Sequence, residues 1–203
     1  PKKYYTGRSP LEALSIGVPM EATDIALRAN LVTLTKGEKN YEDRRITDHS
    51  SGEISTEDAA VLLDAVKEVL EDDIYKFYVG ISYRHLTIWK NRRTVPLEAP
   101  HDHLGQVIGP YLPQEKKLYE MMKKSYDILV DHPINMEREK KGRSPANSLW
   151  FWGAGTRPAL TSFEKKTGKR GVMISAVDLL KGIAVGASMK NITVAGANGG
   201  LHT

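Results

Sequence analysis

The ten residues Ile25-Ala26-Leu27-Arg28-Ala29-Asn30-Leu31-Val32-Thr33-Leu34 predict a β-strand. Apolar residues alternate along much of this stretch, and the side chains of a strand return to the same face every second residue. Arg28 and Asn30 therefore share one face of the predicted strand. An arginine within an apolar strand has to be paired or exposed, because burial of an unpaired charge is costly.

The segments that follow predict a mixture of helices and strands. Ser55-Thr56-Glu57-Asp58 resembles a capping box and predicts a helix start. The aromatic and β-branched stretch Phe77–Trp89 predicts one long strand, on which Arg84 and His85 point to opposite faces. Pro113 predicts the first turn of a helix that runs to about Asp131, and Ser148–Trp152 predicts a short strand. Loops and polar connections are expected at 1–20 (with a short helix), 36–43, 90–113 and 132–147.

The last third of the chain predicts a different arrangement. Gly171–Ser175 is an apolar strand, Ala176–Ser188 has helical spacing, and Asn191–Ala195 is a second strand. A strand–helix–strand unit implies parallel strands with a right-handed crossover. The predicted fold class is therefore α/β: an α+β module flanked by pieces of a doubly wound core.

The composition is that of a globular protein. The chain has 203 residues, of which 40% are hydrophobic and 27% are charged. No apolar run is long enough to cross a bilayer, and the start carries no secretory signal. The absence of cysteine excludes disulfides, thiolate metal ligands and cysteine nucleophiles, and favours the cytoplasm. Because the first residue is Pro1 and not Met, we expect a processed or truncated chain.

The net charge of +4 is small, and the basic runs are interleaved with Glu and Asp. This pattern favours solvated helix faces over a nucleic-acid surface. Isolated arginines stand in settings that do not demand charge, at Arg8, Arg28, Arg84 and Arg157. Several arginines that converge on one cleft would form a site for carboxylate and phosphate groups.

Other polar clusters leave alternatives open. His101-Asp102-His103 could supply metal ligands, but no third ligand is suitably spaced, so a loop that orders itself or binds a substrate is favoured. Asp48 and His49 precede Ser50, but adjacent residues cannot form a catalytic triad. A turn and a functional contact are both possible there. Lys181 could be a surface lysine, or it could reach a site at the strand ends.

A set of short motifs occurs in order over nearly the whole chain. The motifs are Tyr5-Thr6-Gly7-Arg8-Ser9-Pro10-Leu11-Glu12-Ala13, Leu27–Thr33, Asp48–Ser55, Tyr83-Arg84-His85, Pro145-Ala146-Asn147, Trp152-Gly153-Ala154-Gly155, Val177–Gly182 and Gly196-Ala197-Asn198-Gly199. Together they resemble the archaeal-type, cofactor-independent phosphoglycerate mutase family, a branch of the alkaline phosphatase superfamily.

The resemblance implies interconversion of 2- and 3-phosphoglycerate, in glycolysis and gluconeogenesis, through a phosphoserine intermediate. In this family a core domain holds divalent metal ions (Mn, Mg or Zn) and the nucleophilic serine, and an inserted domain closes over the substrate. The motifs for the serine and the metal cluster are not in this chain, and Ser9 occupies a variable motif position. The resemblance therefore implies core pieces at 1–20 and 169–203 around an inserted substrate-binding domain at 21–168. The chain alone is expected to be inactive and metal-free.

The motifs also carry over a set of substrate-binding candidates. They are Arg8, Arg28, Asn30, Asp48, Arg84, His85 and Lys181, with Arg157, His101 and His103 as further candidates. His49 stands where much of the family has arginine, which leaves the contact at that position open. The expected partner is a small phosphorylated carboxylate, with no nucleic acid and no membrane; the oligomeric state is not determined.

Two alternatives remain. Trp150-Phe151-Trp152-Gly153 and Ile174-Ser175-Ala176-Val177-Asp178 look more like a bacterial branch of the family, which has been proposed to act as homoserine kinase. The second alternative is a non-catalytic domain that binds anionic ligands or RNA, and it rests on the pI near 9.1 and the basic runs.

Overall fold

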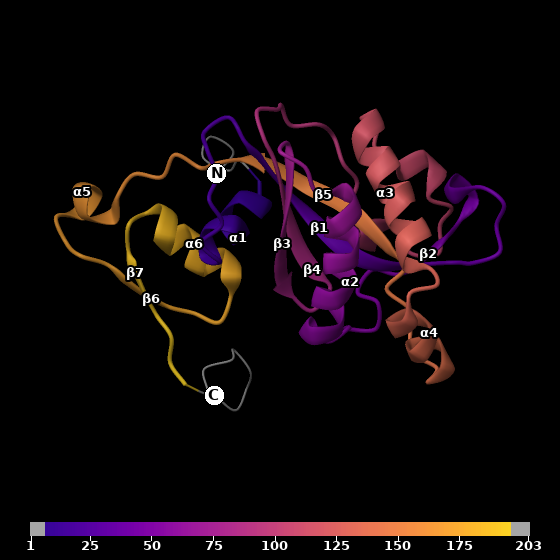
Figure 1. Cartoon of the computed structure of the whole chain (residues 1–203). Coiled ribbons are helices and arrows are strands. Elements are labelled where there is room, and N and C mark those ends of the chain that lie inside the picture. Colours follow the sequence, from indigo (N-terminus) through magenta and orange to yellow (C-terminus); the bar gives the residue numbers. More distant parts are fainter. Residues whose placement is uncertain (1–6, 196–203) are drawn as a thin grey trace.

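The computed structural model describes residues 7–195, in which helices and strands are mixed (Figure 1). The helices are α1 (Ser9–Ser15), α2 (Thr56–Leu70), α3 (Lys116–Leu129), α4 (Pro133–Lys140), α5 (Phe163–Thr167) and α6 (Asp178–Gly186). The strands are β1 (Ile25–Leu34), β2 (Ile46–Asp48), β3 (Tyr75–Ile81), β4 (Arg84–Trp89), β5 (Ser148–Thr156), β6 (Val172–Ile174) and β7 (Lys190–Ile192). Single 3₁₀ turns lie at Tyr41–Asp43, Pro100–His103 and Gly109–Tyr111. The motif Gly196–Gly199 lies outside the described residues.

Strand β1 is the centre of an antiparallel five-stranded sheet. It pairs with β4 on one side, and with β5 and β2 on the other, while β3 pairs with the outer edge of β4. The predicted strand is confirmed, and all ten of its residues are buried. Leu27 and Leu31 pack into the main core with α2 and α3, whereas Ala26 packs on the opposite face with Ala13 of α1. Arg28 and Asn30 therefore lie on the face that α1 approaches.

The two long helices that cover the main core begin with side-chain caps. The hydroxyl of Ser55 accepts a hydrogen bond from the Asp58 N–H at 3.2 Å, which confirms the predicted start of α2. Helix α3 begins at Lys116, where the Glu115 carboxylate accepts from the Lys117 N–H. Pro113 is therefore not the first helical residue, because the cap at Glu115 sets the helix start.

The segment predicted as one strand from 77 to 89 is a hairpin. Strand β3 ends at Ile81 and β4 begins at Arg84, and the two pair antiparallel. Ser82 has a φ of 56°, and a Cβ on Gly80 would lie only 2.0 Å from the Arg84 carbonyl oxygen. The chain turns here because Gly80 tolerates this close approach of the two backbones.

The polar connection predicted at 132–147 contains helix α4. Pro133 occupies its first turn, and the His132 ring accepts a hydrogen bond from the Ile134 N–H at 3.3 Å. Only Asn135 and Arg138 of α4 are buried, so the helix has no apolar stripe from which it could be recognised.

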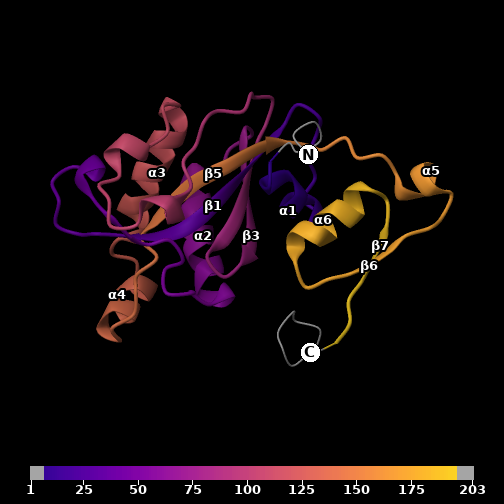
Figure 2. The ribbon, with the colours of Figure 1, turned by 180° about the vertical axis from the view of Figure 1, so that it is seen from behind.

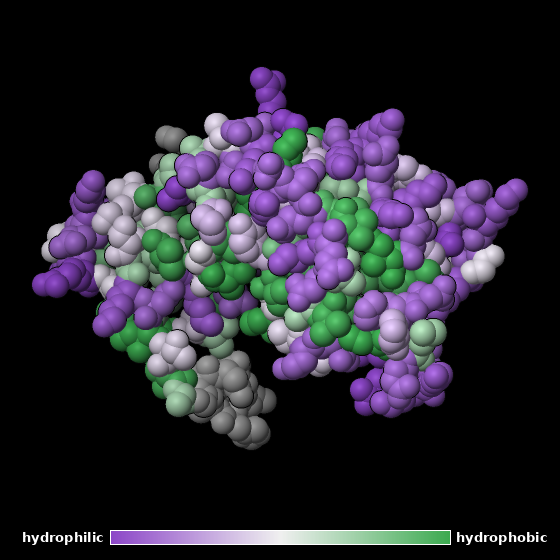
Figure 3. All heavy atoms as spheres, in the orientation of Figure 1, coloured by the Kyte–Doolittle hydropathy of each residue, from purple (hydrophilic) through white to green (hydrophobic). Residues whose placement is uncertain are grey.

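The last third forms the predicted strand–helix–strand unit, with β6 and β7 parallel. Helix α6 packs tightly on α1, and both views show the two side by side at one end of the sheet (Figures 1 and 2). Apolar side chains lie on the surface over α2 and beside the β6–β7 pair (Figure 3), among them Val61, Val69, Val172 and Ile174. The α/β fold class is confirmed. Within residues 7–195, every helix is too short or too polar for a membrane span.

Candidate functional site

Three arginines from separate segments line one cleft. Arg8 precedes α1, Arg28 lies in the middle of β1, and Arg84 begins β4 directly opposite Asn30. The other wall is the start of α6, from Ala176 to Leu179. We call this depression the arginine cleft. Its position between the sheet and the α1–α6 pair brings together residues that are far apart in the sequence.

Glu12 connects two of these arginines. Its Oε1 accepts a hydrogen bond from Arg8 Nε at 2.9 Å, and its Oε2 accepts from Arg28 Nε at 2.7 Å. The side chains of Arg28 and Glu12 are only 8% and 12% exposed. Glu12 is not among the candidates predicted from the sequence, although its spacing of four residues after Arg8 is that of an ion pair on one helix face.

Aromatic rings continue the site along the same side of the sheet. The Arg28 guanidinium lies 4.9 Å from the centre of the Trp152 ring, which in turn meets His101 at 5.2 Å. His49 contacts both His101 and Tyr83 edge-on, with 6.0 Å between ring centres in each case. This row of rings joins the proline-rich loop, the turn after β2 and the β3–β4 hairpin.

Several buried polar atoms of this region have no hydrogen-bond partner among the described residues. They are Oδ1 of Asn30, Nδ1 of His49 and Nε1 of Trp152. Buried polar groups are nearly always satisfied, by protein, water or ligand. Unsatisfied atoms next to a cluster of arginines are therefore consistent with a site that binds a polar molecule.

Asp48 shapes the turn that carries His49. Its two oxygens accept hydrogen bonds from the Ser50 N–H and hydroxyl, at 2.8 and 2.9 Å, and from the Gly52 N–H at 2.6 Å. Burial acts to raise the pKa of Asp48, but these hydrogen bonds outweigh it and hold the pKa below its usual value. The carboxylate is therefore charged at neutral pH, and both of its oxygens are engaged in the turn.

His85 is buried beside the arginine cleft. Its Nδ1 accepts a hydrogen bond from the Gly80 N–H at 3.1 Å, and burial lowers its pKa to about 4. The ring is therefore neutral at pH 7, and the hydrogen is assigned to Nε2, which has no partner in residues 7–195. His85 pairs with Ala29 while Arg84 pairs with Asn30, so the two side chains point to opposite faces.

Three other candidates do not line the arginine cleft. The Lys181 ammonium lies 3.6 Å from Asp178, which does border the cleft. Arg157 donates a hydrogen bond to the Met20 carbonyl at 3.1 Å, and His103 stacks on Tyr111 with 3.7 Å between ring centres. The structure therefore brings together Arg8, Arg28, Asn30 and Arg84, and reaches His101 through Trp152.

Residues 7–195 do not fit a metal centre. Within the part of the chain that the structure describes, no group of three or more His, Cys, Asp or Glu side chains could hold a metal ion. In the His101–His103 loop, the two histidines turn to different aromatic neighbours, Trp152 and Tyr111. The chemistry that this chain offers is fixed positive charge with planar donors, which suits carboxylate and phosphate groups.

The chain resembles known proteins over its whole length. A family model described as 2,3-bisphosphoglycerate-independent phosphoglycerate mutase matches residues 1–135. A protein of that name from Methanosarcina barkeri is 45% identical over 208 residues, which cover 100% of this chain and 50% of the relative. The chain thus spans about half the length of the curated relatives it matches.

Two solved structures are also similar. A cofactor-independent phosphoglycerate mutase from Thermoplasma acidophilum matches with a TM-score of 0.62 and 29% identity, over 98% of this chain and 54% of that one. The PH0037 protein from Pyrococcus horikoshii has a TM-score of 0.71 at 24% identity, over 100% of this chain and 46% of that one. Because its sequence identity is only 24%, the likeness to the PH0037 protein shows the fold alone.

Proposed function

The chain belongs to the 2,3-bisphosphoglycerate-independent phosphoglycerate mutase family, and we propose that it supplies the substrate-binding part of such an enzyme. The complete enzyme would interconvert 2- and 3-phosphoglycerate through a phosphoserine intermediate. The observation that carries this proposal is the arginine cleft, in which Arg8, Arg28 and Arg84 converge from three segments. A phosphorylated carboxylate has two anionic groups and needs fixed cations of this kind.

We assign roles by what each side chain offers. Arg28 and Arg84 lie on one face of the sheet, and each would bind a phosphate or carboxylate oxygen. The unpartnered Oδ1 of Asn30 would accept a hydrogen bond from a substrate hydroxyl. Trp152, which stacks on the Arg28 guanidinium, would form the apolar wall of the site. Substrate-binding roles for Asp48, His85, Lys181, Arg157, His101 and His103 stay predictions.

The domain division stays part of the same proposal. Residues 21–168 would form the substrate-binding domain, and 1–20 and 169–203 would return to the core. The arginine cleft lies where the sheet meets the α1–α6 pair, so closure of one part on the other would surround the substrate. Exclusion of water from that space would protect a phosphoserine from hydrolysis.

One observation supports a second candidate activity. The Trp150–Trp152 stretch, which looks like the proposed homoserine kinase branch, supplies the ring that stacks on Arg28. The same cleft could therefore serve a phosphotransferase with a different acceptor. A cleft with three arginines is less suited to RNA binding than an open basic surface would be.

A pair of assays tests the proposal on the complete gene product. We expect conversion of 3-phosphoglycerate to 2-phosphoglycerate, followed by a coupled assay, and no phosphorylation of homoserine by ATP. Phosphorylation of homoserine without mutase activity would instead support the second candidate. Binding of RNA with a steep dependence on salt concentration, and no turnover of either substrate, would contradict both enzyme activities.

A further inference from the structure

We infer that Glu12 is a positioning residue for substrate binding: it holds Arg8 and Arg28 by their Nε atoms and so directs their terminal amino groups to the substrate. This inference rests on the proposed function. Glu12 lies on α1, outside the predicted substrate-binding domain, yet its carboxylate reaches into the arginine cleft.

The hydrogen-bond pattern supports this role. Glu12 uses one oxygen for each arginine, at 2.9 and 2.7 Å, and in both cases the donor is Nε. Within residues 7–195, the terminal amino groups of Arg8 and Arg28 donate to no other residue. A guanidinium held at Nε still presents its two terminal nitrogens as a planar fork, which matches two oxygens of a carboxylate or phosphate.

The charges of the cleft give Glu12 a second effect. Arg28 is almost fully buried, and a buried cation needs a partner. Glu12 serves Arg28 and Arg8 at once, so it also offsets the repulsion between these arginines and Arg84. The two effects predict opposite results when the charge is removed: loss of positioning weakens substrate binding, whereas loss of a negative charge alone would strengthen the binding of an anion.

The backbone around Glu12 holds it in place. The Ser9 hydroxyl, at the start of α1, donates to the Gly153 carbonyl of β5 at 2.6 Å. Gly153 has a φ of 63°, a left-handed angle that glycine adopts readily, and a Cβ at this position would lie 3.1 Å from the Ser9 hydroxyl oxygen. On the other side α1 packs against α6, where a Cβ on Gly182 would lie 1.8 Å from the Leu11 carbonyl oxygen. Glu12 is therefore presented to Arg28 from a helix that is fixed on two sides.

The test uses Glu12→Gln and Glu12→Asp in the complete gene product. Glutamine keeps the shape, but its amide oxygen can accept from only one of the two Nε donors, and its NH₂ group faces the other. Aspartate keeps the charge but is one methylene shorter. Glu68→Gln is the matched control, because Glu68 is exposed on α2. Circular dichroism and thermal melting would establish that each variant folds.

We expect Glu12→Gln to raise the KM for 3-phosphoglycerate at least about tenfold, which corresponds to the loss of one charged hydrogen bond, with a smaller change in kcat. Glu12→Asp should give an intermediate KM, and Glu68→Gln should behave as the wild type. An unchanged or lower KM for Glu12→Gln would overturn the inference. If Glu12→Gln does not fold, Glu12→Asp decides: a KM equal to that of the wild type would overturn it.

Calorimetric binding of inorganic phosphate separates this inference from the proposed function. A wild-type protein without mutase activity would refute the proposed function. If that protein still binds phosphate, and Glu12→Gln weakens the binding while Glu68→Gln does not, the positioning role of Glu12 stands. Equal phosphate affinity in all three proteins would refute it.

Discussion

Arg138, on α4, fastens the turn that follows β2, and its removal should destabilise the fold. It is 6% exposed, its Nη2 donates to the Ser51 carbonyl at 2.7 Å, and its Nε donates to the Ser144 carbonyl at 3.0 Å. Nη1 also lies 3.7 Å from the Asp58 carboxylate. A single side chain therefore ties three separate segments together.

The turn that Arg138 holds is strained. Three successive residues adopt left-handed backbone angles, with φ values of 51°, 64° and 49° at Ser51, Gly52 and Glu53. Such angles are unfavourable for residues other than glycine, and they persist where surrounding contacts over-determine them. The same turn carries His49, so this strain lies next to the row of rings that His49 forms with Tyr83 and His101.

The variant Arg138→Met keeps much of the apolar stem and removes both hydrogen bonds. A hydrogen bond from a charged donor contributes about 1.5–3 kcal/mol. Burial acts to lower the pKa of Arg138, and Asp58 opposes this. The cost of removing the guanidinium from water therefore offsets part of the stabilisation from its hydrogen bonds. We therefore expect the free energy of unfolding to fall by about 3 kcal/mol, near the lower end of the sum of two such bonds.

Urea denaturation followed by circular dichroism measures this loss. The control is Arg143→Met, since Arg143 is exposed on the same segment and its loss should change stability by less than about 0.5 kcal/mol. A loss for Arg138→Met no larger than that of the control would refute the reasoning.

Two further predictions follow from buried groups. His85 has an ordinary pKa of 6.5 and a folded pKa of about 4, so below pH 6.5 the unfolded chain binds a proton that the folded chain does not. Stability should fall by about 3 kcal/mol between pH 6.5 and 4, and urea titrations of His85→Gln should show a shallower fall; an equal slope would contradict this. Gly182→Ala would place a Cβ 1.8 Å from the Leu11 carbonyl oxygen, so α6 should separate from α1. Limited proteolysis should then cut residues 157–177 faster, and an unchanged rate would count against tight α1–α6 packing.

Local patterns were enough to predict much of the fold. Alternation identified Ile25–Leu34 as a strand, and the Ser55 cap identified the start of α2. The predictions for two segments were wrong, each for a physical reason. The β3–β4 segment is rich in aromatic and β-branched residues, which is why one strand was predicted there. The turn within it depends on the close approach of the Gly80 and Arg84 backbones, which the sequence does not show. Helix α4 was not predicted because it lacks an apolar stripe. Hydrogen bonds from Asn135 and Arg138 to backbone carbonyls hold it in place instead.

The candidate site was predicted in part. The face shared by Arg28 and Asn30 follows from strand periodicity, and the convergence with Arg84 follows from the β1–β4 register. Glu12 could not be placed from the sequence, because its contact with Arg28 depends on how α1 packs beside the sheet. The row from Trp152 through His101 to His49 likewise depends on the path of the proline-rich loop.

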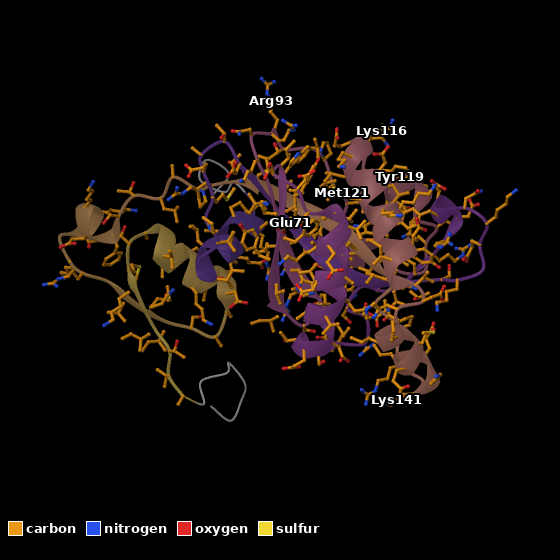
Figure 4. All side chains as sticks on the ribbon, viewed as in Figure 1. Glu71, Arg93, Lys116, Tyr119, Met121 and Lys141 are labelled. Carbon is orange, nitrogen blue, oxygen red and sulfur yellow. The ribbon has the colours of Figure 1, made fainter. Side chains whose placement is uncertain are left out.

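Binding of 3-phosphoglycerate to an Arg84 variant tests the central claim most directly. Arg84 is half-buried, and its guanidinium lies 5.1 Å from the centre of the Tyr83 ring. It forms no ion pair within residues 7–195, so Arg84→Met removes a cleft cation without leaving a carboxylate unpaired. Arg93→Met is the control, because Arg93 projects from the surface (Figure 4). By calorimetry on the complete gene product, at fixed salt, we predict at least about tenfold weaker binding for Arg84→Met, the loss of one charged hydrogen bond. Equal affinity in Arg84→Met, Arg93→Met and wild type would contradict the account.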